Sequence, residues 1–342
     1  MHNPPTFAAP DLSRRAQTWG KVRFQSPELA SIAREQGDLS AWQLLFARYG
    51  PSAVSETSGA YAVAMDLSPG KTFLAVDRFA VQPLCWRLID GRLHFSQRAD
   101  TLAALEPQAE IEPQAVFDYL YFHVIPAPLT VFKGVHRLPA GHYALLDQGQ
   151  VTVAPYWVPS FKNPTGADFQ ELTGEFRALL RAAIGDELDG SRPACFLSGG
   201  TDSSTVAGMI REATGQAADT YSIGFEADGY DEMAFARLAA KHFGANHHEY
   251  YVTPDDLVRT VPMVAGHYDQ PFGNSSVLPA YHCALMARED GVTRLLAGDG
   301  GDELFGGNVR YATQRVFGLY SSVPAALRAG VMEPLLLRTP FG

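Results

Sequence analysis

The sequence predicts an α/β protein of two domains, and three observations carry that prediction. The length of 342 residues is comfortable for two globular domains and long for one. The first hundred residues contain short apolar or alternating segments divided by turn residues, which is typical of a packed antiparallel sheet. Beyond residue 168, amphipathic helical patterns alternate with short apolar segments, which predicts a mostly parallel sheet covered by helices on both faces.

Local patterns predict the N-terminal elements. Apolar residues within 27–49 are spaced for a helix or helix pair that ends at Gly50-Pro51. Four strands are then expected, at residues 60–66, 72–77, 83–89 and 93–97. Residues 117–157 mix aromatic residues with proline, which predicts a wrapped connector containing a hairpin. The predicted division is a lobe of residues 1–110, a connector of residues 111–162 and a second domain of residues 163–342, with the polar stretch 160–168 as the boundary.

The second domain begins with an amphipathic helix at residues 169–183. The elements expected after it are a strand at 193–197, a helix from 201, a strand at 219–225, a helix at 232–243, and strands at 247–252 and 293–298. Open parallel sheets bind ligands beyond the carboxyl ends of their strands. We therefore expect the loops that follow residues 197 and 296 to lie together and form a site.

Composition excludes several classes of protein. The chain has 27 basic and 37 acidic residues, a net charge of −10, and no clustered basic face, so neither nucleic acid nor a membrane surface is an expected partner. No apolar run approaches the length of about 20 residues that a membrane-spanning helix needs. The three cysteines, Cys85, Cys195 and Cys283, lie far apart without metal-type spacing, which fits a reducing cytoplasm.

The stretch SGGTDSS at residues 198–204 follows the predicted strand and opens a helix. Gly199 and Gly200 permit a tight turn that presents backbone N–H groups to an anion, and the helix adds the positive end of its dipole. The carboxylate of Asp202 would repel that anion unless a divalent cation lay between them, which indicates a magnesium–phosphate pair. Taken alone, the loop fits a capped strand-to-helix turn equally well.

A second glycine loop changes that balance. Residues 298–307 read GDGGDELFGG after another apolar segment and contain the carboxylates of Asp299, Asp302 and Glu303. Such a loop can complete a metal shell or orient a substrate amine. Together the two loops indicate a nucleotide site.

The pair of loops resembles a known family. SGGTDSS is similar to the phosphate loop of the ATP-pyrophosphatase superfamily, and GDGGDELFGG at this distance resembles the asparagine synthetase family in particular. The similarity extends to FAVQPL at residues 79–84 and to residues 125–143, so that an N-terminal lobe of the Ntn-hydrolase glutamine-amidotransferase type is implied. In that family, ATP and Mg²⁺ activate a carboxylate as an acyl-adenylate, pyrophosphate leaves, and ammonia or an amine completes the amide.

The resemblance implies roles for individual residues. Asp202 and Asp302 would hold magnesium, and Asp299 would be the catalytic residue that contacts the activated acid or the amine. Weaker candidates for substrate contact are Asp38, Asp269 and Ser275 or Ser276. The nucleotide would contact Leu197, Ser198, Gly199, Gly200, Asp202, Ser203, Ser204, Ile223, Ala297 and Gly298.

Departures from the family pattern concern glutamine. The family lobe begins Met-Cys-Gly, whereas this chain begins MHNPP and has no cysteine before Cys85. The family's FGIRPL is replaced by FAVQPL, and its Ser-Glu by Ser96-Gln97, so we do not expect glutamine hydrolysis. The family also continues past the equivalent of the last residues TPFG and supplies a lysine there, so we expect the second domain to be C-terminally incomplete.

Three functions follow as hypotheses. One is an asparagine synthetase-like ligase with aspartate as the default acid. The second is a relative that forms an intramolecular amide without glutamine, as β-lactam synthetases and lasso-peptide cyclases do. The third is an ATP-binding pseudoenzyme. The sequence leaves the acid, the amine and the assembly open, with a homodimer as one candidate assembly.

Overall fold

The computed structural model describes residues 15–161, 166, 168–188, 190–226, 231–307, 311 and 318–336. The chain forms two compact units. The first contains residues 1–165 and 258–278, and the second contains residues 166–257 and 279–342. The chain therefore leaves the second unit and returns to it, while the domain limits drawn from the sequence stay a prediction.

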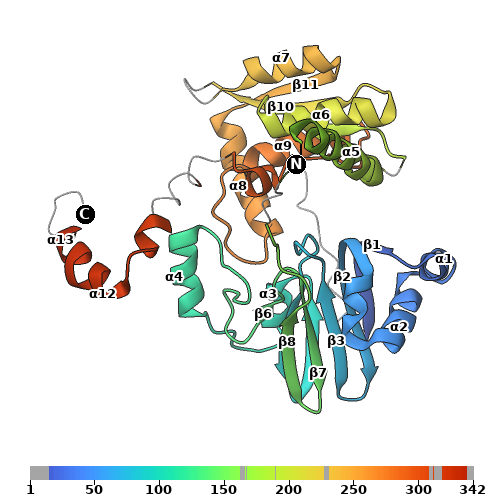
Figure 1. The fold of residues 1–342 in the computed structure, drawn as a ribbon, viewed down its shortest axis with the longest axis vertical. Coiled ribbons are helices and arrows are strands. Elements are labelled where there is room, and N and C mark those ends of the chain that lie inside the picture. Colours follow the sequence, from blue (N-terminus) through green and yellow to red (C-terminus); the bar gives the residue numbers. More distant parts are fainter. Residues whose placement is uncertain are drawn as a thin grey trace. The chain divides into compact units, whose positions relative to one another are not determined.

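Two antiparallel sheets form the frame of the first unit (Figure 1). The larger has the order β1-β2-β3-β7-β8 and consists of β1 (Ala16–Phe24), β2 (Thr57–Ser68), β3 (Lys71–Val76), β7 (His142–Asp147) and β8 (Gln150–Pro155). The smaller has the order β5-β4-β6 and consists of β4 (Cys85–Ile89), β5 (Arg92–Ser96) and β6 (His136–Arg137). The four strands expected between residues 60 and 97 are thus present as β2 to β5, divided between two sheets.

The helices of the first unit are α1 (Pro27–Gln36), α2 (Asp38–Tyr49), the short helix η1 (Gly50–Glu56), α3 (Ala99–Ala103) and α4 (Pro113–Phe122). Side chains of α1 and α2, with Trp42 and Leu45 at their centre, pack on one face of the larger sheet. The other face of that sheet packs on the smaller one through Leu74, Leu84 and Leu138. Helix α3 packs behind the smaller sheet. These contacts make four layers, helix, sheet, sheet and helix, as the Ntn-type prediction requires.

The second unit contains a parallel sheet of order β11-β10-β9. Its strands are β9 (Ala194–Phe196), β10 (Asp219–Phe225) and β11 (Asn246–Val252). The strand expected at residues 293–298 is reduced to a single bridge of Leu296 to Cys195. Only one residue pairs because the chain bends into the glycine loop directly afterwards.

Helices cover both faces of this sheet. On one face, α5 (Phe169–Leu188), α6 (Thr201–Thr214) and α7 (Met233–Phe243) bury Ile184, Ile210 and Ala236. On the other face, α9 (Val277–Glu289) contributes Cys283 and Ala287 beside Tyr221. The predicted parallel α/β architecture is confirmed.

The remaining helices are α8 (Pro254–His267), α10 (Gly301–Phe305), α12 (Ala325–Leu327), η2 (Arg328–Met332) and α13 (Glu333–Leu336). None of the helices in the described part of the chain combines the length and the apolar character needed to cross a membrane.

Candidate functional site

The loop between β9 and α6 is shaped by a glycine. Gly199 has φ +85°, a conformation that L side chains rarely adopt. A Cβ atom at this position would also collide with the backbone of Phe235 and Ala236 at the start of α7. Glycine is therefore required by both the turn and its close contact with the neighbouring helix.

Two serine hydroxyls brace the loop from within. The Oγ atoms of Ser198 and Ser203 lie 3.0 Å apart, and the Ser203 hydroxyl oxygen also accepts the Ser198 N–H at 3.1 Å. The Ser198 hydroxyl in turn accepts the Gly200 N–H at 3.3 Å. The loop is thus held in a closed turn by its own side chains before any ligand binds.

The amino end of α6 supplies the donors for an anion. Its first backbone bond runs from the Ser204 N–H to the Gly200 carbonyl at 3.1 Å. The amides of Thr201, Asp202 and Ser203 precede that bond, and amides at this position in a helix have no intrahelical acceptor. With the dipole of a 14-residue helix behind them, they form an anion-binding end.

The second glycine loop lies directly on this helix end. A Cβ at Gly298 would lie 2.8 Å from the Cβ of Asp202 and 3.1 Å from the Ser203 nitrogen. A Cβ at Gly301 would collide with the Asp202 carboxylate itself, and one at Gly307 with the carboxylate of Asp302. At both glycines a carboxylate occupies the space where a side chain would be, so a Cβ atom there would displace that carboxylate. The structure therefore brings the two predicted loops into contact.

The donor chemistry of this junction fits magnesium together with phosphate. Asp202 opens α6, and Asp302 lies in the first turn of α10. Carboxylate oxygens are the ligands that magnesium takes, usually one or two of them together with substrate phosphates and water. Among the described residues no group of three metal-ligating side chains exists that could hold a metal by itself. The arrangement therefore suits an ion that arrives with a phosphate ligand.

The predicted contacts to adenosine lie at the carboxyl ends of the strands. The Leu197 N–H donates to the Tyr221 carbonyl at 3.0 Å, and the Leu197 carbonyl accepts the Ser222 hydroxyl. Leu197 can therefore contact a nucleotide only through its side chain or through the second lone pair of its carbonyl oxygen. Ile223 lies on β10 beyond the end of its pairing with β9. Ala297 and Gly298 follow the bridge at Leu296.

Asp299 lies on the loop between the Leu296 bridge and α10 and is exposed. Within the described residues it forms no ion pair, so its carboxylate is available to a ligand. Ser275 is also exposed, on the segment that precedes α9. Together with Tyr268 and Phe272 it lines a cavity of about 770 Å³ in the first unit.

Asp269 lies in the same segment, but its carboxylate is held by protein groups. One oxygen accepts Arg137 Nη2 at 2.7 Å and the Ala99 N–H at 2.6 Å. The side chain of Asp269 is 12% exposed and that of Arg137 is 24% exposed. Arg98 donates to the carbonyls of the adjacent His267 and Tyr268. These contacts favour a structural role for Asp269 in fixing the segment.

Asp38 begins α2 and has no ion-pair partner among the described residues. Burial raises the pKa of its carboxyl group. The one cysteine in the sequence of the first unit is Cys85, a fully buried residue whose pKa is raised to about 12 by that burial. A thiol in this state is not a nucleophile near neutral pH.

Two departures from the family pattern meet in the structure. Gln97 Nε2 donates to Gln82 Oε1 at 2.9 Å. The family pattern places arginine and glutamate at these positions, so an amide pair stands here where opposite charges would face one another. The sequence alone hints at this contact, because the two residues of the family pattern that are replaced here carry opposite charges. The pairing of β4 with β5 is needed to show that Gln82 and Gln97 touch.

Comparison with known proteins identifies two families that match this chain. The family described as asparagine synthase matches residues 175–339, and the glutamine amidotransferase domain family matches residues 23–157. A Methanocaldococcus jannaschii protein named for asparagine synthetase (glutamine-hydrolyzing) is 32% identical over 83% of this chain and 56% of its own length. Asparagine synthetase (glutamine-hydrolyzing) 1 of Bacillus subtilis is 26% identical over 83% of this chain and 45% of its own.

A third relative is the carboxyethyl-arginine beta-lactam-synthase of Streptomyces clavuligerus, 28% identical over 80% of this chain and 51% of its own length. A solved NH3-dependent NAD synthetase from Campylobacter jejuni aligns with a TM-score of 0.29 at 12% identity, over 39% of this chain and 56% of that chain, which is too weak to carry an argument. The chain spans about half the length of the curated relatives it matches. On the two family matches and these relatives, the chain belongs to the asparagine synthetase family.

Proposed function

We propose that this chain is the catalytic part of an ATP-dependent, amide-forming ligase that activates a carboxylate as an acyl-adenylate and releases pyrophosphate. The observation that carries the proposal is the contact between the two glycine loops, in which Gly298 and Gly301 leave room for Asp202 at the amino end of α6. The relatives named as asparagine synthetases support the same reaction class.

The loop chemistry explains why pyrophosphate would be the leaving group. No lysine lies in residues 198–204 to reach a γ-phosphate, as it does in P-loop enzymes. The amides at the amino end of α6 would instead hold the β- and γ-phosphates as one anion, which leaves the α-phosphorus open to an incoming carboxylate. Asp202 and Asp302 would hold magnesium, which neutralises the charge that develops on the pyrophosphate.

Asp299 is the residue we assign to the activated acid or the amine. Its carboxylate is exposed beside the loop junction, where it can orient a substrate amine by hydrogen bonding. Aspartate is the default acid, and ammonia or a small amine is the partner in the second step. The three cysteines are free and buried, which supports placing this activity in the reducing cytoplasm.

A second candidate is intramolecular amide formation. One observation favours it, namely the similarity to the Streptomyces clavuligerus beta-lactam-synthase. In that case the amine would come from the substrate itself. Synthesis that proceeds with a single amino-acid-type substrate and without ammonia would identify this variant.

The test of the proposal is a product analysis. The full 342-residue chain is incubated with α-labelled ATP, magnesium, ammonia and either aspartate or another candidate acid, and nucleotide products are resolved. We expect labelled AMP and an equal amount of pyrophosphate, both dependent on the acid. Labelled ADP formed together with amide would assign the loops to a different chemistry.

Binding is tested separately, because the chain spans about half the length of its relatives and ATP binding can be measured whether or not turnover occurs. Calorimetry with ATP should show saturable binding that weakens when magnesium is removed. Equal affinity with and without magnesium would contradict the assignment of Asp202 and Asp302. Asp255→Asn, at an exposed acidic residue on α8, is the matched control for a substitution of Asp202 or Asp302. It should bind magnesium–ATP as the wild type does.

A further inference from the structure

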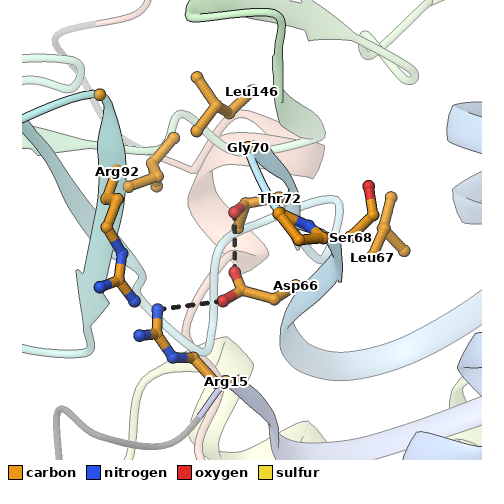
Figure 2. A pocket seen from close by; sticks show the side chains of 11 residues that line it. Arg15, Asp66, Leu67, Ser68, Gly70, Thr72, Arg92 and Leu146 are labelled. Atoms are coloured by element: carbon orange, nitrogen blue, oxygen red, sulfur yellow. Dashed lines mark hydrogen bonds and ion pairs between the residues drawn. The ribbon is translucent and has the colours of Figure 1, made fainter.

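A cavity of about 470 Å³ lies in the first unit, apart from any residue assigned above (Figure 2). Both sheets contribute to it, through the turn between β2 and β3 and the turn between β4 and β5. Its lining consists of Arg15, Asp66, Leu67, Ser68, Pro69, Gly70, Thr72, Gly91, Arg92, Leu93 and Leu146.

The acidic group in this cavity is fixed and neutralised. Arg15 Nη1 lies 3.2 Å from Asp66 Oδ2, and the Thr72 hydroxyl donates to Asp66 Oδ1 at 2.7 Å. The Asp66 N–H also donates to the Arg15 carbonyl at 2.7 Å, which ties the start of β1 to the end of β2. Each oxygen of the carboxylate therefore has a partner, as the dashed lines in Figure 2 show.

The basic groups are only partly used. Among the residues that the structure describes, Asp66 alone accepts from the Arg15 side chain, through one contact of 3.2 Å, so most of the five guanidinium N–H donors of Arg15 are available within this part of the chain. Arg92 is exposed and forms no ion pair with any residue that the structure describes. Figure 2 shows the guanidinium groups of Arg15 and Arg92 on the same side of the cavity. The two arginines and Asp66 together give the lining of the cavity a net charge of +1.

The floor of the cavity is apolar. Leu93 and Leu146 are 5% and 1% exposed and belong to the core between the two sheets. Leu67 also lines the cavity, but it packs against the core on the other face of the larger sheet. A ligand that lies on this floor under the two guanidinium groups would need an aliphatic body and an anionic head.

We propose that this cavity binds a small aliphatic monocarboxylate, with its carboxylate across Arg92 and Arg15 and its hydrocarbon part on Leu93 and Leu146. A guanidinium fork matches the two oxygens of a carboxylate. A single negative charge balances the cavity, whereas the second charge of a phosphate would meet the carboxylate of Asp66. The proposal does not depend on the ATP loops, because every residue in it lies in the first unit.

The experiment is calorimetric titration of the full chain with 4-methylpentanoate, with 4-methylpentanol and with inorganic phosphate at the same ionic strength. We expect saturable binding of the carboxylate and neither of the others. Arg92→Gln should weaken it about tenfold or more, the usual size of a lost charge-assisted hydrogen bond. Arg34→Gln, an exposed arginine of α1, is the matched control and should leave the affinity unchanged.

A charge variant sharpens the test. In Asp66→Asn the amide oxygen can still accept the Thr72 hydroxyl, but the local charge rises by one, so phosphate should now bind detectably. Circular dichroism checks that each variant is folded. No saturable binding of the carboxylate to the wild type, an unchanged affinity in folded Arg92→Gln, or equal affinity of the wild type for phosphate would each overturn the proposal.

Discussion

Asp77 and Asp269 of the first unit differ from Asp202 of the second unit in what their carboxylates contact. In the first unit, buried Asp77 accepts backbone N–H groups from Tyr61, Phe79, Val81 and Gln82 at 2.9 to 3.3 Å. One carboxylate oxygen of Asp269 accepts hydrogen bonds from the Arg137 side chain and the Ala99 N–H. In the second unit, Asp202 faces the bare Cα of Gly301 and has no ion-pair partner among the described residues. An aspartate on a loop is thus a candidate ligand site only where protein donors have not already used its oxygens.

The largest expected effect comes from Gly199→Ala. The left-handed backbone costs about 1 to 2 kcal/mol for a residue with a Cβ, and the collision with α7 forces a further shift. We expect a loss of about 3 kcal/mol in the free energy of unfolding, measured with urea, and loss of detectable ATP binding. Gly185→Ala in α5, where a Cβ meets nothing within 4 Å, is the control and should stabilise slightly.

Asp269→Ala tests whether a carboxylate held by protein groups contributes to stability and not to ATP binding. Removing one partner leaves the partly buried Arg137 unpaired, so the free energy of unfolding should fall by about 2 to 4 kcal/mol. Magnesium–ATP affinity of the folded variant should stay within about twofold of the wild type. If this variant loses ATP affinity but keeps its stability, Asp269 belongs to the substrate site and the comparison fails.

Asp202→Asn tests whether a carboxylate without an ion-pair partner among the described residues contributes to ATP binding and not to stability. It removes the carboxylate that we propose as a magnesium ligand, and this carboxylate has no ion pair among the described residues. Magnesium–ATP affinity should therefore drop by about tenfold or more while stability changes by less than about 0.5 kcal/mol. Calorimetry and urea unfolding on the same preparation give both quantities. An unaltered affinity would mean that the junction of the two loops does not hold the metal.

The pH dependence of stability should follow the cluster at the amino ends of β10 and β11. Burial raises the pKa of Asp219, but hydrogen bonds from Arg192, Asn246 and His248 outweigh it and hold the pKa below its usual range. Burial lowers the pKa of His247. For both groups the unfolded chain binds the proton more readily than the folded chain does, so stability is complete above about pH 6.5.

Acidification should therefore reduce the free energy of unfolding in two stages. The first begins below about pH 6.5 as His247 protonates in the unfolded chain, and the second below about pH 4 through Asp219. His247→Gln should reduce the first stage, to which His136 also contributes because burial lowers its pKa. Asp219→Asn should reduce the second stage, to which Glu249 also contributes because the hydrogen bond from Arg237 lowers its pKa. A stability that is flat from pH 7 to pH 3 would show that neither group is perturbed as its surroundings indicate.

The smallest effect concerns Gln82 and Gln97. Gln97→Glu alone places a partly buried charge against an amide and should cost about 1 kcal/mol, whereas Gln82→Arg with Gln97→Glu should recover most of that loss. A double-mutant cycle of urea unfolding measures the coupling. Additive single effects would mean that the two amides are neighbours without an energetic connection.

Much of the contact between the two glycine loops could be predicted from sequence because it depends on local features of the chain. Gly199 marks a turn by its own backbone freedom, and the rule that ligands bind at the carboxyl ends of parallel strands places residues 198–204 and 298–307 together. The alternating residues of β2 to β5 and the helical spacing of apolar residues in α5 to α7 also predict these elements from the sequence. The site assignments themselves stay predictions.

What could not be predicted depends on contacts between distant residues. The partners of Asp269 lie 132 and 170 positions away, so nothing near residue 269 reveals that its carboxylate is occupied. The Gln82 and Gln97 contact depends on strand register. Strand β1 was missed because its polar and apolar residues do not alternate regularly, and the expected strand at 293–298 was overestimated because an apolar run does not show how many residues pair.

The discontinuous path of the chain has a consequence for synthesis on the ribosome. When residues 1–165 have emerged, the first unit still lacks residues 258–278. Arg137 then lacks the carboxylate of Asp269, and the loop contacts from Arg98 to the carbonyls of His267 and Tyr268 cannot yet form. Translation of the intervening segment takes on the order of ten seconds. During that interval we expect the nascent first unit to be a natural client for chaperones, and codon choice across residues 166–257 to affect the yield of folded protein.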